Sequence, residues 1–112
     1  MDLKSEVADG IAIHRVSGKI DALTAPNLEA AVGSAISAGT ARIVFDMRNV
    51  TYVSSAGLRA ILSGTKRAAA ADGRLVIYGL QSLVSEVFES SGLGNLILIA
   101  ADENQARTRV RA

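Results

Sequence analysis

Apolar and polar residues alternate along the first part of the chain. The alternation covers residues 3–7 and 11–16, and Asp9-Gly10 lies between the two runs. A period of two is typical of strands whose two faces differ, and an Asp-Gly pair favours a tight two-residue turn. The sequence therefore predicts an antiparallel hairpin at the N-terminus.

Apolar residues then take up helical spacing over residues 24–39. Thr24 is a candidate N-cap, and Pro26 fits a first turn because the N–H groups of that turn have no partner within the helix. Gly39 suits the left-handed residue that ends a helix. The predicted buried stripe comprises Leu28, Ala31, Val32, Ala35 and Ile36.

Short apolar runs alternate with helical segments over the rest of the chain. Runs at 43–45, 75–78 and 96–99 predict strands buried on both faces. A second helix begins at Ser54 or Ser55 and ends at Asp72-Gly73, and a third begins with Ser82 as its cap and ends at Gly92. Asp102 is the candidate cap of a fourth. The predicted inward residues of these helices are Leu58, Ile61, Leu62, Ala69, Leu83, Val84, Val87, Phe88, Ala106 and Val110.

The order of these elements predicts one small α/β domain that spans residues 1–112. Strands that alternate with helices imply right-handed βαβ crossovers and a largely parallel sheet. The N-terminal hairpin adds one antiparallel strand, and about four helices accompany the sheet.

Composition removes several classes of function. The 12 basic and 11 acidic residues leave a net charge of +1, so neither nucleic acid nor a membrane surface is an expected partner. The basic tail of Arg107, Arg109 and Arg111 is interpreted as a solvated helix end. The absence of cysteine and the single His14 exclude disulfides, thiolate catalysis and multi-histidine metal sites. The polar N-terminus and the absence of a long apolar run predict a cytoplasmic protein without cofactor or metal.

Two adjacent serines stand where the second helix begins. One hydroxyl is enough to cap a helix, so the second is left for solvent or a partner. Gly57 removes side-chain bulk beside them, which would let the backbone of another protein approach. A phosphate on Ser55 would carry a charge of about −1.5 to −2 and lie at the positive end of the helix dipole. The modified domain is therefore expected to remain folded, while burial of the same charge against a partner would be costly.

Other chemistry fits the sequence less well. The segment 53–57 lacks the first glycine of a G-x-S-x-G nucleophile elbow, and the lone His14 lies in an early strand without an acidic neighbour, so no enzyme activity is expected. Asp46 is interpreted as a carboxylate that stabilises the turn before Arg48-Asn49. The alternative, a degenerate receiver phosphorylated on Asp46, lacks the acidic pair and the lysine of that class.

The stretch IVFDMRNVTYVSSAGLRAIL, with GKIDALTAPNLEAAV before it and LILIAADENQAR after it, resembles STAS domains, and specifically stand-alone anti-anti-sigma factors. The resemblance covers essentially the whole chain. It implies a mixed sheet of four to five strands with helices mainly on one face. The family's phosphoacceptor serine corresponds to Ser55, and the usual preceding aspartate is replaced by Ser54.

The resemblance also implies a partner switch. The unphosphorylated protein would bind an anti-sigma factor, a serine kinase of the histidine-kinase-like ATPase fold, and phosphorylation would release it. A metal-dependent Ser/Thr phosphatase would restore binding. Ser55 is thus the expected phosphoacceptor, and the expected docking surface comprises Asp21, Thr24, Ser54, Ala56, Gly57 and Leu58. The alternative is a ligand-sensing or scaffolding STAS module that is never phosphorylated.

Overall fold

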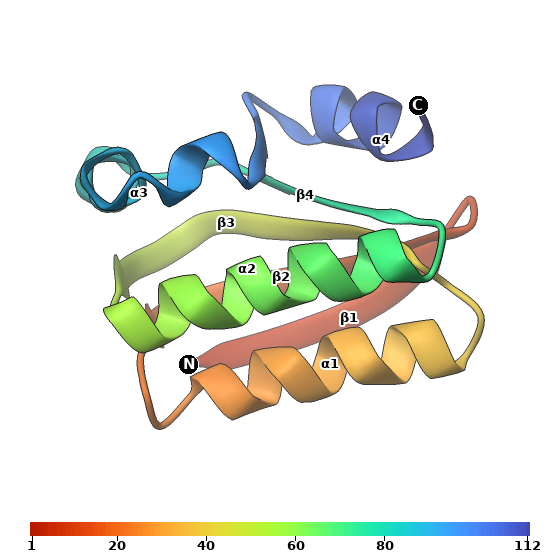
Figure 1. Cartoon of the computed structure of the whole chain (residues 1–112), viewed down its shortest axis with the longest axis horizontal. Helices are drawn as coiled ribbons and strands as arrows, with labels where there is room; N and C mark the ends of the chain where they lie inside the picture. Colours follow the sequence, from red (N-terminus) through yellow and green to blue (C-terminus); the bar gives the residue numbers. More distant parts are fainter.

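The computed structural model describes residues 1–112 as a five-stranded sheet with helices on both faces (Figure 1). The strand order is β1-β2-β3-β4-β5; β1 and β2 are antiparallel, and the remaining neighbours are parallel. This arrangement confirms the predicted mixed α/β domain. The strands are β1 (Asp2–Ala8), β2 (Ile11–Ile20), β3 (Arg42–Val53), β4 (Arg74–Tyr78) and β5 (Leu98–Ala100). The helices are α1 (Ala25–Ser37), α2 (Ser55–Ala70), α3 (Ser82–Ser91) and α4 (Glu103–Arg111), with a 3₁₀ turn, η1, at Leu93–Asn95.

The predicted hairpin is confirmed. Ala8 pairs with Ile11, and the two turn residues between them, Asp9 and Gly10, have φ values of 53° and 75°. Two consecutive positive φ angles define a turn whose twist matches that of the strands. The turn thus sets the register in which β1 lies along the edge of the sheet.

Strands β2 and β3 are longer than the sequence pattern predicts. β2 continues through Gly18 to Ile20, with register shifts against β3 between Arg15 and Ser17 and between Gly18 and Lys19. β3 spans 12 residues rather than three. Its pairing with β4 ends at Asp46, so the rest of β3 pairs with β2 alone. This extension carries the chain to the start of α2.

Helices α1, α2 and α3 pack on one face of the sheet, and α4 packs on the other (Figure 1). The larger core lies beneath the first three helices and includes Phe45, Ile61 and Phe88. The smaller core joins Val110 of α4 to the opposite face of β2, β3 and β4. Helices mainly on one face are therefore confirmed.

Several helix boundaries follow the sequence pattern. Gly39 and Gly92 have φ values of 90° and 75° where α1 and α3 end, as expected of left-handed terminal residues. The side chain of Asp102 accepts a hydrogen bond from the N–H of Gln105 at 2.8 Å and caps α4 as predicted. These termini fix where each helix leaves the sheet.

Other local predictions are wrong in whole or in part. Thr24 stands at the N-cap position of α1 as predicted, but its hydroxyl makes no cap bond to that helix. Gln81 rather than Ser82 stands at the N-cap of α3. In α2, the inward residue near the end of the helix is Ala68 rather than the predicted Ala69, which is exposed. The buried face of the helix is displaced by one residue at this point. Leu83 is exposed rather than inward. The last strand begins at Leu98 because η1 occupies the chain before it.

Candidate functional site

Ser54 anchors the start of α2. Its backbone N–H donates to the carbonyl oxygen of Ile20 at 2.9 Å, and its Oγ accepts from the N–H of Gly57 at 3.2 Å. Ser54 is therefore the N-cap, and both its backbone and its side chain are engaged within the fold.

Ser55 is the first residue of α2, and its side chain is exposed. Its hydroxyl makes no hydrogen bond within the chain, whereas the neighbouring hydroxyl of Ser54 is occupied by the cap. Ala56 follows it, half-buried. The two serines thus have different roles, and the hydroxyl of Ser55 is the one available to another molecule.

Gly57 belongs to the interior of the fold. A β-carbon at this position would lie 2.7 Å from the carbonyl oxygen of Ile20 and 2.9 Å from its Cγ2. The expectation that Gly57 makes room for a partner's backbone is wrong, because the space beside it is filled by β2. Its lack of a side chain instead lets α2 approach the end of that strand closely.

The β2–α1 loop is held together by Asp21 and Thr24. Oδ1 of Asp21 accepts from the N–H groups of Leu23 at 3.0 Å and Thr24 at 3.2 Å. The Thr24 hydroxyl accepts from the N–H of Asp21 and donates to the carbonyl oxygen of Lys19, both at 2.9 Å. These bonds shape the loop next to Ser54 and leave Leu23 88% exposed. Asp21 and Thr24 are thus structural residues of a loop that borders the serine pair.

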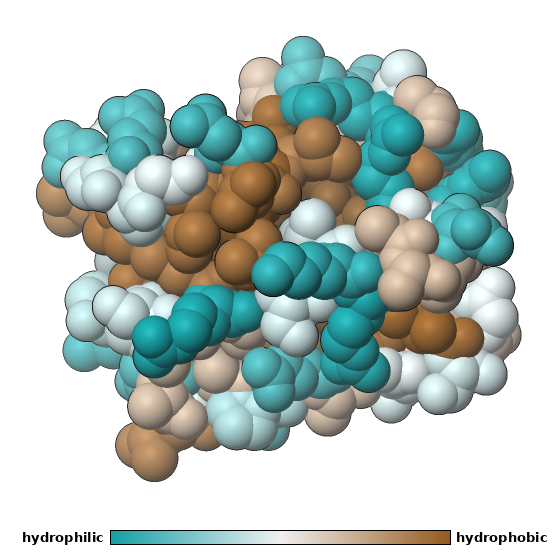
Figure 2. Space-filling model, in the orientation of Figure 1, coloured by the Kyte–Doolittle hydropathy of each residue, from teal (hydrophilic) through white to brown (hydrophobic).

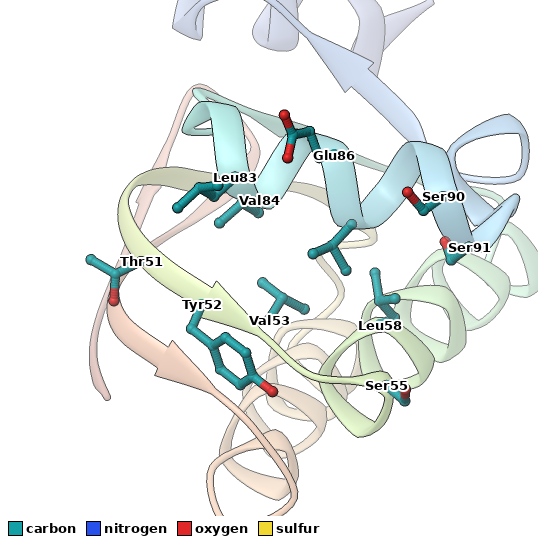
Figure 3. Close-up of a pocket in the computed structure, with 11 residues that line it drawn as sticks. Thr51, Tyr52, Val53, Ser55, Leu58, Leu83, Val84, Glu86, Ser90 and Ser91 are labelled. Carbon is teal, nitrogen blue, oxygen red and sulfur yellow. The ribbon is translucent and has the colours of Figure 1, made fainter.

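An apolar groove opens beside Ser55. It lies between the end of β3, the first turns of α2, and α3, and Leu58 contributes to its wall with only 5% of its surface exposed. Figure 2 shows the groove as a hydrophobic patch between α2 and α3. Figure 3 shows Ser55 at its rim, below the side chains of α3. The lining residues are Thr51, Tyr52, Val53, Ser55, Leu58, Leu83, Val84, Glu86, Val87, Ser90 and Ser91.

The groove includes two exposed apolar side chains that sequence reasoning missed. Tyr52 is 49% exposed and Leu83 is 72% exposed. Leu83 fits the inward stripe of α3 by spacing, and only the placement of α3 over the end of β3 leaves it in solvent. Tyr52 carries a signal in the sequence, since it precedes the apolar Val53 and adjacent side chains of a strand point to opposite faces, so burial of Val53 leaves Tyr52 on the other side. Together the two side chains make the region around Ser55 suited to contact with another protein.

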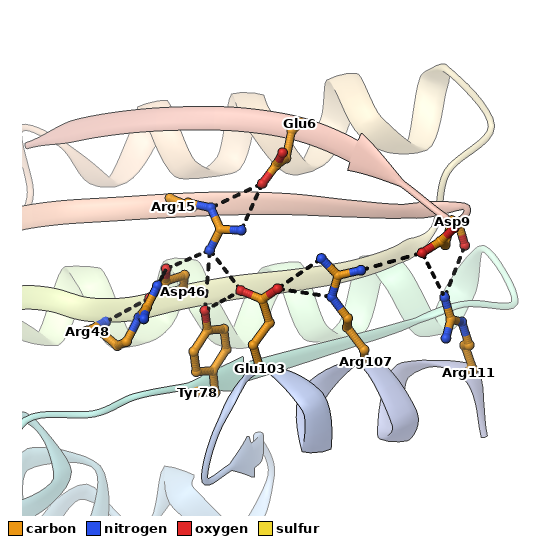
Figure 4. A network of polar contacts seen from close by, with 9 residues as sticks. All are labelled: Glu6, Asp9, Arg15, Asp46, Arg48, Tyr78, Glu103, Arg107 and Arg111. Carbon is orange, nitrogen blue, oxygen red and sulfur yellow. Dashed lines mark hydrogen bonds and ion pairs between the residues drawn. The ribbon is translucent and has the colours of Figure 1, made fainter.

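A polar network lies on the opposite face of the sheet (Figure 4). Asp46, whose side chain is 4% exposed, accepts from Nη1 of Arg15 at 2.9 Å and from Nη2 of Arg48 at 2.8 Å. Burial acts to raise the pKa of Asp46, but the hydrogen bonds from Arg48 and Arg15 outweigh it and hold that pKa well below its usual range. Asp46 lies within β3 and not in a turn, so its predicted role in the turn is wrong.

Glu103 connects α4 to the same network. It accepts from Nη1 of Arg15 and from the hydroxyl of Tyr78, both at 2.9 Å. The hydrogen bonds from Arg15 and Tyr78 lower the pKa of Glu103 to about 2. Since the carboxylate of Asp46 is enclosed by arginines in this network, a receiver-type phosphoacceptor at Asp46 has no support in the structure.

The arginines of the C-terminal tail also bind within the chain. Arg107 pairs with Glu103 at 2.9 Å and with Asp9 at 3.6 Å. Arg109 donates to the carbonyl oxygen of Ile99 at 2.8 Å. The interpretation of this tail as a solvated helix end is therefore wrong for these two side chains, because they fasten α4 to the sheet.

Two further features bear on the site. No group of three or more histidine, cysteine, aspartate or glutamate side chains is placed to hold a metal ion. None of the helices has the length and the apolar character that crossing a membrane would require.

Comparison with known proteins shows the family to which this fold belongs. The sequence model of the STAS domain family matches residues 2–106, and the chain belongs to this family. It is 34% identical over 106 residues to the "Putative anti-sigma factor antagonist BtrV" of Bordetella bronchiseptica, with 95% of this chain and 91% of that protein covered. It is 28% identical over 97 residues to the anti-sigma-B factor antagonist of Staphylococcus aureus, with coverage of 87% and 90%.

Solved structures give the same picture. The anti-sigma factor antagonist SpoIIAA in its unphosphorylated form is 25% identical, with a TM-score of 0.81 over 98% of this chain and 96% of that chain. The phosphorylated form of SpoIIAA, described as a Bacillus cell fate determinant, is 25% identical with a TM-score of 0.72 over 98% and 100%. The likeness extends over the full sheet and its helices.

Proposed function

We propose that this chain is an anti-sigma factor antagonist, a binding module without catalysis of its own, controlled by phosphorylation of Ser55. The names of the relatives that cover the whole domain support the first part of the proposal. The solved phosphorylated form of the similar protein SpoIIAA supports the second.

The observation that carries the proposal is the division of roles between the two serines. The hydroxyl of Ser54 accepts the hydrogen bond that caps α2, whereas the hydroxyl of Ser55 is exposed and has no partner. A kinase that transfers the γ-phosphoryl group of ATP to Ser55 Oγ, with release of ADP and a proton, would not have to break any internal contact of that hydroxyl. Ser55 is therefore the proposed phosphoacceptor.

The groove beside Ser55 explains how one phosphate would control binding. The proposed partner surface consists of this groove together with Ser54, Ala56, Leu58 and the loop at Asp21 and Thr24. A phosphate at the rim would remain hydrated in the free protein but would lose water in the complex. Desolvation of an unpaired dianion costs several kcal/mol, and about 1.4 kcal/mol is a tenfold change in affinity.

The proposed partners follow from this cycle. The unphosphorylated protein would bind an anti-sigma factor that is also a serine kinase of the histidine-kinase-like ATPase fold. A metal-dependent Ser/Thr phosphatase would remove the phosphate and restore binding. These three proteins would meet in the cytoplasm.

The test is phosphorylation of the purified protein by its cognate kinase with ATP, followed by peptide mass spectrometry. Wild type and Ser54→Ala are expected to acquire one phosphate at residue 55, and Ser55→Ala none. Phosphate found only outside residues 50–62 would discard the assignment. If no kinase modifies the protein and it instead binds a nucleotide or another small ligand, the STAS module has the alternative sensing or scaffolding role.

A further inference from the structure

Arg59 stands one helical turn after Ser55. The two residues are four positions apart in α2, and both side chains are exposed. Residues at i and i+4 lie on the same face of a helix, with about 5–6 Å between their β-carbons. A guanidinium at position 59 is thus within reach of a group attached to the oxygen of Ser55.

The guanidinium of Arg59 has no partner in the chain. It makes no hydrogen bond or ion pair, whereas Arg67 of the same helix donates to the carbonyl oxygen of Glu29 at 3.1 Å. α2 contains no acidic residue that would compete for it. Figure 2 shows hydrophilic side chains over α2 next to the apolar groove. Arg59 is therefore a free cation at the edge of the proposed docking surface.

We propose that Arg59 binds the phosphate on phosphorylated Ser55 and forms an intramolecular clamp over the first turn of α2. This inference rests on the proposed function, since it concerns the modified form of the same site. The order of the pair favours it, because an anion on the N-terminal side of a cation at i, i+4 agrees with the helix dipole. The planar fork of arginine also matches two phosphate oxygens at once.

Three other charged side chains near Ser55 could also interact with the phosphate. Glu86 lines the same groove, and Asp21 borders Ser54 through Ile20; both are acidic and would repel the phosphate. Lys19 is exposed on β2 next to Ile20 and is the other cation at this end of the domain. Lysine lacks the fork of arginine and lies on a different element, so the geometry favours Arg59.

The clamp has a measurable consequence for the phosphate itself. A neighbouring guanidinium stabilises the dianion, so the second pKa of the phosphate falls relative to a variant without it. From the strength of helical i, i+4 pairs we expect a fall of about 0.15–0.4 pH unit. The opposing carboxylates of Asp21 and Glu86 are present in wild type and variants alike and do not change the difference.

The experiment is a ³¹P NMR titration of full-length protein that carries phosphoserine at position 55, installed by amber-codon suppression. Wild type is compared with Arg59→Ala, Arg59→Lys and Lys19→Ala. Lys66→Ala is the matched control, because Lys66 is an exposed residue of α2 about three turns from Ser55. The three side chains replaced in these four variants are exposed, and circular dichroism checks that each variant is folded.

The expected result is a phosphate pKa that rises in Arg59→Ala, rises less in Arg59→Lys, and stays unchanged in Lys66→Ala. An unchanged pKa in Arg59→Ala, or a shift produced by Lys19→Ala alone, would overturn the clamp. Because the phosphate is introduced without a kinase, this result is separate from the proposed function. Failure of the kinase to modify Ser55 would remove the physiological role and leave the measured contact in place.

Discussion

The carbonyl oxygen of Ile20 lies 2.7 Å from the point where a β-carbon on Gly57 would stand, so the end of β2 and the first turn of α2 are in direct contact. The same oxygen accepts the backbone hydrogen bond of Ser54. The start of α2 is therefore positioned by β2 as well as by β3, which fixes the serine pair relative to the loop at Asp21.

The Gly57→Ala variant is expected to lose about 1–3 kcal/mol of unfolding free energy, because the added methyl group meets backbone that cannot easily move. Urea denaturation measures this loss. Gly33→Ala is the matched control: its methyl group would meet only the far end of the long Arg67 side chain, which can shift at the cost of one hydrogen bond to Glu29. Helix propensity should therefore make this variant neutral or stabilising by up to about 1 kcal/mol. Equal stability of the two variants would contradict the close contact at Gly57.

The two serines should differ in their effect on stability. Ser54→Ala removes the cap of α2 and is expected to lower the unfolding free energy by about 0.5–2 kcal/mol. Ser55→Ala removes an exposed hydroxyl without a partner and should change it by less than about 0.5 kcal/mol. Thermal or urea unfolding of both variants checks the assignment, and a larger loss in Ser55→Ala would reverse it.

His14 should make stability fall on mild acidification. Burial lowers the pKa of His14 below its ordinary 6.5, so between the lowered value and 6.5 the unfolded chain binds more protons than the native one. Stability is thus fully present above pH 6.5 and declines as the pH falls towards the native pKa. Urea denaturation at pH 7.5 and 5.5 should show this decline in wild type and a smaller one in His14→Gln. A wild type that gains stability on acidification would contradict it.

The buried Asp46 should contribute more to the unfolding free energy than Glu6, the exposed partner of Arg15. Asp46→Asn is expected to cost about 1–3 kcal/mol, since Arg48 loses its carboxylate and Arg15 keeps Glu103. Glu6→Gln, at a side chain 53% exposed, should cost no more than about 1 kcal/mol.

The contribution of Asp46 to stability should also depend on pH. Because the native pKa of Asp46 is held down, this contribution is present above the unfolded pKa of 3.8 and is lost as the pH falls further. The wild-type advantage over Asp46→Asn measured at pH 7 should therefore shrink in acid.

Leu83 should contribute to partner binding under the proposed function. Leu83→Glu places a charge on an exposed groove residue, so it should weaken binding of the unphosphorylated protein to its anti-sigma factor by about tenfold or more. Leu96→Glu is the matched control, at a leucine 58% exposed outside the groove. Calorimetric titration of both variants distinguishes them, and equal affinities would exclude the groove as the docking surface.

The order of elements could be predicted from the sequence because each apolar run and each helical stripe is local. The lengths of β2 and β3 could not. Beyond Phe45 the chain contains Asp46, Arg48 and Asn49, which break the apolar run, yet this part of β3 continues as a strand since β2 pairs with it and Arg15 neutralises Asp46. Long-range pairing and charge compensation are not visible in a local pattern.

The candidate site was predictable in part. The serine pair and its helix follow from the sequence, but the choice of Ser54 as the cap depends on the position at which β3 ends and α2 begins. The roles of Gly57 and Leu83 depend on which element lies opposite: β2 fills the space beside Gly57, and solvent meets Leu83. Spacing within one helix carries no information about its neighbours.

The placement of α4 has a practical consequence. This helix carries the last residues of the chain and lies across the sheet from α2, as Figure 1 shows. A flexible tether or fluorophore joined to Ala112 would leave from the side away from the groove. The protein fixed to a sensor surface through that residue would present Ser55 to the bulk solution, so kinetics measured there should match those in free solution.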